Sequence, residues 1–187
     1  MRAFIAITPP DALRFAFAAA QQELAASGAD VAWVAPANLH VTLKFLGDIT
    51  EPQREAISRT LQAIATLTAP FTLQAVGVGA FPSAHAPRVV WVGLEDAEGQ
   101  LARMAALIER EARILTLPSE EHSFSAHVTL GRVRSSRGRT ALAERLGSAV
   151  FRHAAAWPVT SVTLYQSHLS GAGARYTVLA DLPLTGR

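Results

Sequence analysis

The stretch Asn38-Leu39-His40-Val41-Thr42-Leu43-Lys44-Phe45 decides the fold, because its central tetrapeptide occurs twice in the chain. His40-Val41-Thr42-Leu43 returns unchanged as His127-Val128-Thr129-Leu130, 127 − 40 = 87 residues later. In both copies polar and apolar side chains alternate, which is the period of a strand with one solvated and one buried face. Each copy therefore places an imidazole and a hydroxyl side by side on the solvated face.

The offset of 87 residues extends beyond the tetrapeptide. Arg88 and Arg175 each open an apolar strand pattern, and the strand pattern at 71–81 corresponds to the one at 158–168. We interpret this as an internal duplication. It favours one bilobal domain spanning residues 1–187, with two pseudo-symmetric lobes that each present a His-x-Thr pair to a central cleft.

The composition is that of a globular protein that buries a sizeable core, with 50% hydrophobic and 17% charged residues among 187. No cysteine is present, which excludes disulfides, thiolate metal sites and a cysteine nucleophile. No apolar run approaches the roughly 20 residues of a membrane span. Pro9 and Pro10 cut the N-terminal apolar run too short for a signal peptide. We therefore expect a cytoplasmic protein with no membrane association.

The remaining patterns predict an α+β fold of largely antiparallel sheets with helices on their outer faces. Strands are predicted at 2–7, 31–34, 39–46, 71–81, 88–94, 124–133, 157–169 and 175–182. Helices are predicted after the N-caps Thr8 and Thr50, at 101–115 and at 142–150. Within 71–81, Gly77 and Gly79 indicate a bulge or a close backbone approach.

Two imidazoles facing each other across a cleft are suited to paired proton transfer near neutral pH, whereas a lone histidine on a strand is more often structural. The hydroxyls of Thr42 and Thr129 are short donors for an anion between the imidazoles. Four arginines follow the second motif, namely Arg132, Arg134, Arg137 and Arg139. In isolation they indicate a solvated loop, but beside this strand they favour a phosphate. No Asp, Glu and His set with metal-ligand spacing accompanies either motif, so we predict phosphoryl transfer without a metal or other cofactor.

The paired motifs resemble those of the 2H phosphoesterase superfamily, and their flanks resemble its RNA 2′,3′-cyclic phosphodiesterases, also called 2′-5′ RNA ligases. The stretches that carry the resemblance are residues 2–7 (RAFIAI), 33–47 (WVAPANLHVTLKFLG), 81–82 with 87–91 (FP and PRVVW) and 127–132 (HVTLGR). One departure is Ala126, where the family often has proline before the second histidine. We expect a looser loop there and no loss of activity.

The resemblance implies an enzyme that opens an RNA 2′,3′-cyclic phosphate with water and leaves a 2′-phosphate. By the same resemblance, His40 is the proton donor to the departing 3′ oxygen and His127 is the proton acceptor that activates water. Thr42, Thr129 and Arg132 would bind the phosphate. The two motifs are locally identical, so the sequence alone does not assign acid and base. Strict alternation places Arg132 on the face opposite His127, so its role requires a twist or bulge.

Several alternatives stay open at this stage. The substrate could instead be a 2′-5′-linked oligonucleotide or a small cyclic nucleotide, reversible 2′-5′ ligation is unresolved, and the chain could be a non-catalytic RNA-end binder. The expected binding partner is an RNA 3′ end, and we expect the protein to be a monomer. Four rings are expected in the core, although one of them, or Phe4, could stack a terminal base. These rings are Trp33, Phe45, Trp91 and Tyr165.

Overall fold

The computed structural model describes residues 1–119, 123–148, 156–171 and 173–186. The strands are β1 (Arg2–Ile7), β2 (Val31–Trp33), β3 (Val41–Asp48), β4 (Phe71–Phe81), β5 (Val89–Glu95), β6 (His127–Val133), β7 (Ala156–Val159), β8 (Ser161–Ser170) and β9 (Gly173–Pro183). The helices are α1 (Asp11–Ala25), α2 (Glu51–Leu67), α3 (Gln100–Ile114) and α4 (Arg139–Ser148), with a short 3₁₀ turn, η1 (Pro36–Asn38).

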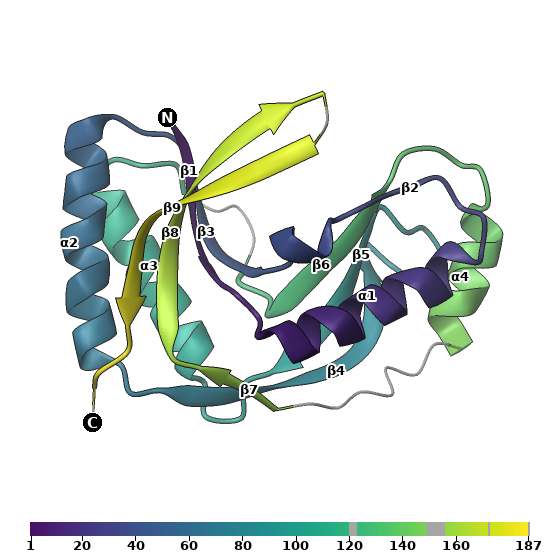
Figure 1. Cartoon of the computed structure of the whole chain (residues 1–187), viewed down its shortest axis with the longest axis horizontal. Coiled ribbons are helices and arrows are strands. Elements are labelled where there is room, and N and C mark those ends of the chain that lie inside the picture. Colours follow the sequence, from purple (N-terminus) through teal and green to yellow (C-terminus); the bar gives the residue numbers. More distant parts are fainter. Residues whose placement is uncertain (120–122, 149–155, 172, 187) are drawn as a thin grey trace.

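The strands form two sheets, one in the order β3-β1-β8-β9 and the other in the order β2-β6-β5-β4-β7. Every strand pair within them is antiparallel. This confirms the predicted α+β class with largely antiparallel sheets. The two motif strands, β3 and β6, lie in different sheets, so each sheet carries one copy of the repeated tetrapeptide (Figure 1).

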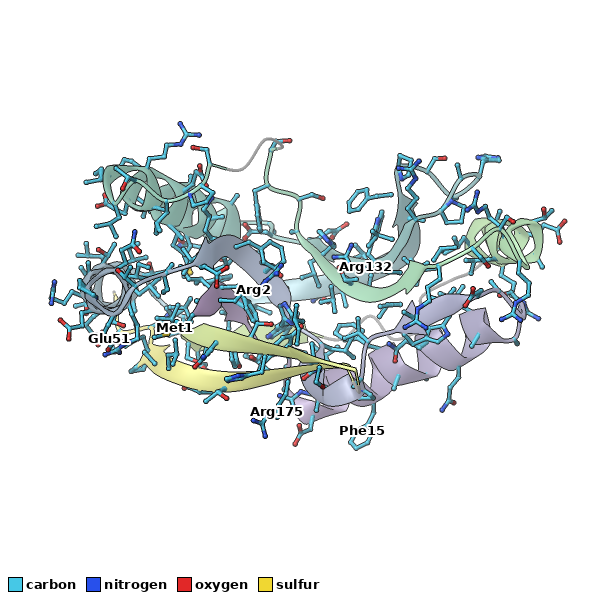
Figure 2. The ribbon with its side chains drawn as sticks, turned by 90° about the horizontal axis from the view of Figure 1, so that it is seen from above. Met1, Arg2, Phe15, Glu51, Arg132 and Arg175 are labelled. Atoms are coloured by element: carbon cyan, nitrogen blue, oxygen red, sulfur yellow. The ribbon has the colours of Figure 1, made fainter. Side chains whose placement is uncertain are left out.

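Each lobe combines segments from both halves of the chain. The first sheet takes β1 and β3 from the N-terminal half and β8 and β9 from the C-terminal end, while β4 crosses into the second sheet. The helices cross in the same way, since α2 and α3 gather at one end of the molecule and α1 and α4 at the other (Figures 1 and 2). Neither lobe is therefore a contiguous segment. That residues 1–187 form one domain by duplication stays a prediction.

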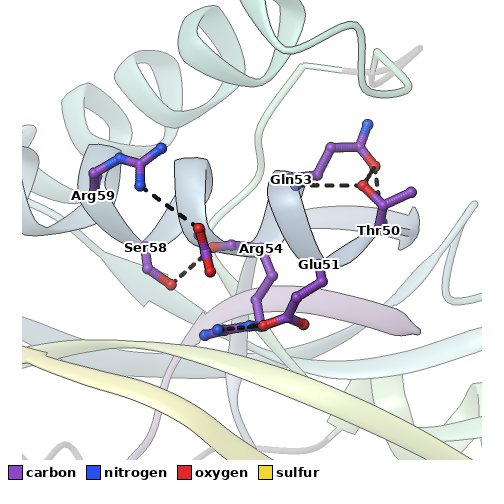
Figure 3. Close-up of polar contacts among 7 residues, drawn as sticks. Thr50, Glu51, Gln53, Arg54, Ser58 and Arg59 are labelled. Carbon is purple, nitrogen blue, oxygen red and sulfur yellow. Dashed lines mark hydrogen bonds and ion pairs between the residues drawn. The ribbon is translucent and has the colours of Figure 1, made fainter.

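The N-terminus of α2 follows from local sequence. The Thr50 hydroxyl accepts a hydrogen bond from the backbone N–H of Gln53 at 3.4 Å, and the Gln53 side-chain oxygen accepts one from the backbone N–H of Thr50 at 2.9 Å (Figure 3). This capping box satisfies two donors that the first turn leaves without helical partners. Glu51 suits the positive end of the helix dipole. The predicted cap at Thr50 is confirmed.

The predicted cap of the first helix is wrong. Pro10 is the N-cap of α1 and makes no side-chain cap hydrogen bond. The Thr8 hydroxyl instead shares a hydrogen bond with the Tyr165 hydroxyl at 2.7 Å. Tyr165 belongs to β8, far away in sequence, so a tertiary partner takes the hydroxyl that the local pattern assigned to the helix.

The strand predicted at 157–169 is two strands. It divides at Thr160 into β7, which pairs with β4, and β8, which pairs with β1. β7 is an edge strand, which is where Pro158 is tolerated. The buried positions change phase across the break, from Trp157 and Val159 to Val162 and Leu164, which is the mark that the change of sheet leaves in the sequence. The second motif strand begins at His127 and not at residue 124, and the last two residues of the helix predicted at 142–150 lie outside the described residues.

The glycines of β4 have the predicted roles. The β4–β5 register skips Gly77, whose φ is +54°, so the strand carries a bulge there. The Trp91 ring of β5 packs directly over Gly79, where any side chain would collide with it. Within the described part of the chain, no helix is long and apolar enough to cross a membrane.

Candidate active site

The structure brings all five predicted site residues to one cavity. His40 lies directly before β3 and His127 opens β6, and both line a cavity of about 360 Å³ together with Thr42, Thr129 and Arg132. Residues of the β8–β9 hairpin also line it, so we call it the hairpin-side cavity. The two His-x-Thr pairs therefore face one shared space and not two separate ones.

The two imidazoles are held by equivalent backbone hydrogen bonds. Nδ1 of His40 lies 2.7 Å from the carbonyl oxygen of Asn38, and Nδ1 of His127 lies 2.8 Å from that of Ser125. These carbonyls are themselves 125 − 38 = 87 residues apart. Because a carbonyl oxygen only accepts, Nδ1 carries a hydrogen in both rings. Nε2 is consequently the atom of each histidine that gains or loses a proton.

Burial lowers the pKa of both histidines below the usual 6.5, and nearby positive charge lowers it further. For His40 the second lowering influence is the charge of His127, which places the two rings within electrostatic reach. For His127 it is the guanidinium of Arg132. The backbone hydrogen bonds to Asn38 and Ser125 oppose both shifts. An anion bound between the rings would oppose this lowering, because it stabilises their protonated forms.

A bulge in β6 brings Arg132 to the same face as His127. Opposite β5, Trp91 pairs with Thr129 and Val90 pairs with Gly131, so Leu130 is skipped. The extra residue reverses the alternation beyond it, and Arg132 is exposed in the middle of the molecule (Figure 2). The bulge that the predicted role of Arg132 required is therefore present.

The first motif strand carries a bulge at the equivalent place. Opposite β1, Ala6 pairs with Thr42 and Ile5 with Lys44, so Leu43 is skipped. Leu43 stands 130 − 43 = 87 residues before Leu130. The bulge turns Phe45 toward the cavity with 51% of its surface exposed. The prediction that Phe45 belongs to the core is wrong, because strict alternation does not hold past Leu43.

Tyr176 of β9 is a cavity residue that the sequence did not reveal. Its ring lies edge-on to the His40 ring, 5.5 Å between centroids, and 4.8 Å from the buried Phe4 ring, which itself lies 4.9 Å from His40. Burial raises the pKa of the Tyr176 hydroxyl. Val89 stands at the 87-residue offset from Tyr176, so the duplication gave no signal.

Asn38 fixes the strand entry and the hairpin together. Its side-chain N–H donates to the carbonyl oxygen of Ala174 at 2.7 Å, while its own carbonyl accepts from His40.

Among the four arginines after the second motif, Arg132 lines the cavity, whereas Arg134, Arg137 and Arg139 do not. Arg137 lies 4.0 Å from the Asp30 carboxylate instead.

Behind the first motif strand, Lys44 anchors β3 to α3. Its ammonium lies 2.7 Å from the Glu109 carboxylate and donates to the carbonyl of Pro118 at 2.5 Å, and only 2% of the residue is exposed. A buried charge needs such partners.

Among the described residues, no group of three or more His, Cys, Asp or Glu side chains is placed to hold a metal ion.

Sequence comparison then places the chain among known proteins. The family model described as LigT like Phosphoesterase matches residues 7–91 and again residues 92–176. The chain belongs to this family. The LigT-like chain is 35% identical over 155 residues to a protein of Aquifex aeolicus named RNA 2′,3′-cyclic phosphodiesterase, and the match covers 82% of each chain. The resemblance predicted from the two motifs is confirmed.

Solved structures give the same result for the fold. The crystal structure of the Thermus thermophilus protein TT0787 superposes with a TM-score of 0.87 at 30% identity, over 100% of both chains. Escherichia coli LigT, crystallised with 3′-AMP, superposes with a TM-score of 0.82 at 25% identity over 98% of both chains.

Proposed function

We propose that this LigT-like phosphoesterase hydrolyses RNA 2′,3′-cyclic phosphate ends, with His40 and His127 as its proton carriers. The observation that carries the proposal is the shared cavity. Two imidazoles, both with Nδ1 tied to the backbone, line it together with the cationic Arg132. The name of the Aquifex aeolicus relative and the 3′-AMP bound by Escherichia coli LigT support a phosphorylated nucleoside as the ligand.

The protonated forms of the two histidines are disfavoured by different neighbours. Burial is the largest influence on both pKa values, joined by the charge of His127 at His40 and by the charge of Arg132 at His127. These influences lower both pKa values, so the roles are assigned by the family resemblance of the two motifs, with His40 as the proton donor and His127 as the proton acceptor.

The reaction then follows from these positions. A water oxygen attacks phosphorus and gives its proton to Nε2 of His127. The bond from phosphorus to O3′ breaks, and O3′ takes the proton from Nε2 of His40, which leaves a 2′-phosphate and a free 3′-hydroxyl. Thr42, Thr129 and Arg132 bind the phosphate oxygens, and the charge of Arg132 offsets the negative charge that develops there. All of these groups come from one chain, so we propose that the monomer is active.

The test uses a synthetic RNA that ends in a 2′,3′-cyclic phosphate, incubated with the protein in the presence of a chelator. We expect hydrolysis, with the phosphate retained on the 2′-hydroxyl as read by phosphorus NMR. Retention on the 3′-hydroxyl would reverse the assignment of the leaving oxygen. Binding of the RNA without any turnover would leave the alternative of a non-catalytic RNA-end binder. Turnover only after a divalent ion is added would contradict the metal-free mechanism.

A further inference from the structure

Gln21 is a buried polar side chain of α1 that the mechanism above does not use. Only 7% of this residue is exposed. The other buried positions of α1 are all apolar, namely Leu13, Phe17, Ala20 and Leu24. An amide among such residues destabilises the fold unless it forms hydrogen bonds. The partners of Gln21 therefore indicate what this side chain does.

Gln21 forms hydrogen bonds with two backbone carbonyls. Its Nε2 donates to the carbonyl oxygen of Leu130 at 2.8 Å and to that of Val34 at 2.8 Å. Because a carbonyl oxygen only accepts, these two partners fix the orientation of the amide. The Leu130 carbonyl also accepts from the backbone N–H of Val34 at 2.8 Å. The three residues thus form one hydrogen-bonded cluster.

This cluster lies at the bulge of β6. Leu130 is the residue that the register with β5 skips. The register between β2 and β6 ends at Trp33 and Gly131, so the bond from Val34 to Leu130 continues this ladder by one residue. A β6 strand that paired regularly with β5 would turn Arg132 to the opposite face. The hydrogen bonds that hold the Leu130 carbonyl therefore also keep Arg132 on the side of the cavity.

The cluster also lies where the chain crosses from one sheet to the other. Val34 follows β2 of the second sheet and lines the hairpin-side cavity. On the same segment, the carbonyl of Asn38 fixes the ring of His40 directly before β3 of the first sheet. Gln21 therefore joins the segment that leads to the first motif to the strand that carries the second.

The first motif strand is joined to the rest of the molecule in a comparable way. Lys44, directly after the bulge of β3, pairs with Glu109 of α3 and donates to the carbonyl of Pro118, on the segment between α3 and β6. Each bulged strand is thus bonded to the segment that leads to the other motif. The residue at the 87-residue offset from Gln21 is Ile108, which has no side-chain donor, so α3 holds no copy of the Gln21 contact.

We propose that Gln21 is a positioning residue for the reaction, which holds the β6 bulge and Arg132 in place relative to the segment that leads to His40. This rests on the proposed function, in which Arg132 binds the phosphate. Gln21 does not line the cavity, so it acts through Arg132. The phosphate has to fit between Arg132 and the two imidazoles, and a small displacement of either side lowers the rate.

The experiment is a double-mutant cycle. Gln21→Met, an apolar side chain of similar length, removes both hydrogen bonds, and Gln21→Leu is a second variant. Each is combined with Arg132→Gln, and kcat/KM is measured on a 2′,3′-cyclic mononucleotide. Thr163→Val is the matched control, because it removes the hydrogen bond that the buried Thr163 hydroxyl donates to Asp181 at 2.7 Å, outside the cavity. Circular dichroism and urea unfolding check the fold and stability of every variant.

We expect Gln21→Met to lower kcat/KM by about tenfold, and to lower it little further in the presence of Arg132→Gln, because both changes affect the same contact with the phosphate. Thr163→Val should lower stability and keep the wild-type kcat/KM. Losses that multiply in the double variant overturn the positioning role, and so does an equal loss in Thr163→Val. Unchanged kcat/KM in the folded Gln21 variants, or failure of both to fold, also overturns it.

Proton NMR titration of the His127 ring gives a readout that needs no turnover. Burial and the charge of Arg132 lower the pKa of His127. A Gln21 variant that releases Arg132 should therefore raise this pKa, by no more than Arg132→Gln does. An unchanged pKa overturns the positioning role. Wild-type protein that turns over no cyclic phosphate overturns the proposed function, and the titration then decides the role of Gln21.

Discussion

The two motif strands carry the same four residues in different surroundings. In both motifs the histidine forms a hydrogen bond with the carbonyl oxygen two residues earlier, and both β3 and β6 have a bulge at the motif leucine. Beyond the bulge they differ, since β3 presents Phe45 to the cavity and β6 presents Arg132. The repeated segment thus sets the position of each histidine, and the residues that differ around it set the charges that each histidine meets.

The residue directly after the bulged leucine is Gly131 in β6 and Lys44 in β3, and packing explains this difference. β2 pairs with β6 at Gly131, where an added Cβ would meet Val31, Trp33 and the backbone of Ala32. The first sheet has no strand beside β3 at this place, and the equivalent residue is Lys44, which reaches α3 instead. One motif strand is therefore an interior strand and the other an edge strand.

The first prediction tests whether both motifs are needed for turnover. We expect His40→Ala and His127→Ala each to lower kcat/KM on a cyclic-phosphate RNA by about 10²- to 10⁴-fold, because each would remove one of the two proposed proton carriers. Steady-state kinetics measure the loss. His85→Ala, at an exposed position outside the hairpin-side cavity, is the control and should match wild type. Near-normal turnover by either motif variant would mean that the two strands do not act together.

Variants of Arg132 and Phe45, the residues that follow the two bulges, test whether the two strands contribute differently to activity. Arg132→Gln should lower kcat/KM on a cyclic mononucleotide by about 10- to 100-fold, because it would remove the charged hydrogen bonds that we propose Arg132 donates to the phosphate. Phe45→Leu should cost less on this substrate, because it changes no charge. Arg134→Gln, exposed and outside the hairpin-side cavity, is the control for general loss of positive charge. Equal losses for Arg132→Gln and Phe45→Leu would contradict the division of roles.

The free energy of unfolding tests the close packing of Gly131 against β2. Gly131→Ala should lower the free energy of unfolding by about 1 to 3 kcal/mol, because the methyl group overpacks the contact with β2. Urea unfolding at fixed pH measures it. Gly147→Ala, in α4 with no neighbour within 4 Å of the added atom, should be neutral or stabilising. A neutral Gly131→Ala would show that β2 does not constrain β6.

The smallest expected effect is on the pKa values of the two histidines, which have different charged neighbours. Both histidine pKa values are lowered below 6.5 in the free protein, and catalysis needs one ring protonated and the other neutral. The bell-shaped profile of kcat/KM should therefore peak below pH 6.5. Arg132→Gln removes a positive charge and should raise the pKa of His127, as proton NMR titration of its ring would show. An unchanged or lower pKa would contradict the assigned influence of Arg132.

The sequence predicted much of this arrangement because the relevant signals are local. The α+β class followed from alternation and helical spacing, and the cap at Thr50 followed from a hydroxyl and an amide three residues apart. The five residues that line the shared cavity could be picked out because the His-x-Thr pair repeats and an arginine follows the second copy. The cap assigned to Thr8 failed because its hydroxyl found a partner on a distant strand, Tyr165.

By itself, then, the sequence determined that two identical strands each present an imidazole and a hydroxyl on one face, because side-chain alternation is a property of the extended backbone. The tertiary structure decided what surrounds them. The bulges that turn Phe45 and Arg132 into the cavity depend on the register with β1 and β5. Tyr176 reaches His40 because β8 and β9 complete the first sheet. Register and sheet membership depend on pairing between distant segments, and a one-dimensional pattern carries no record of that pairing.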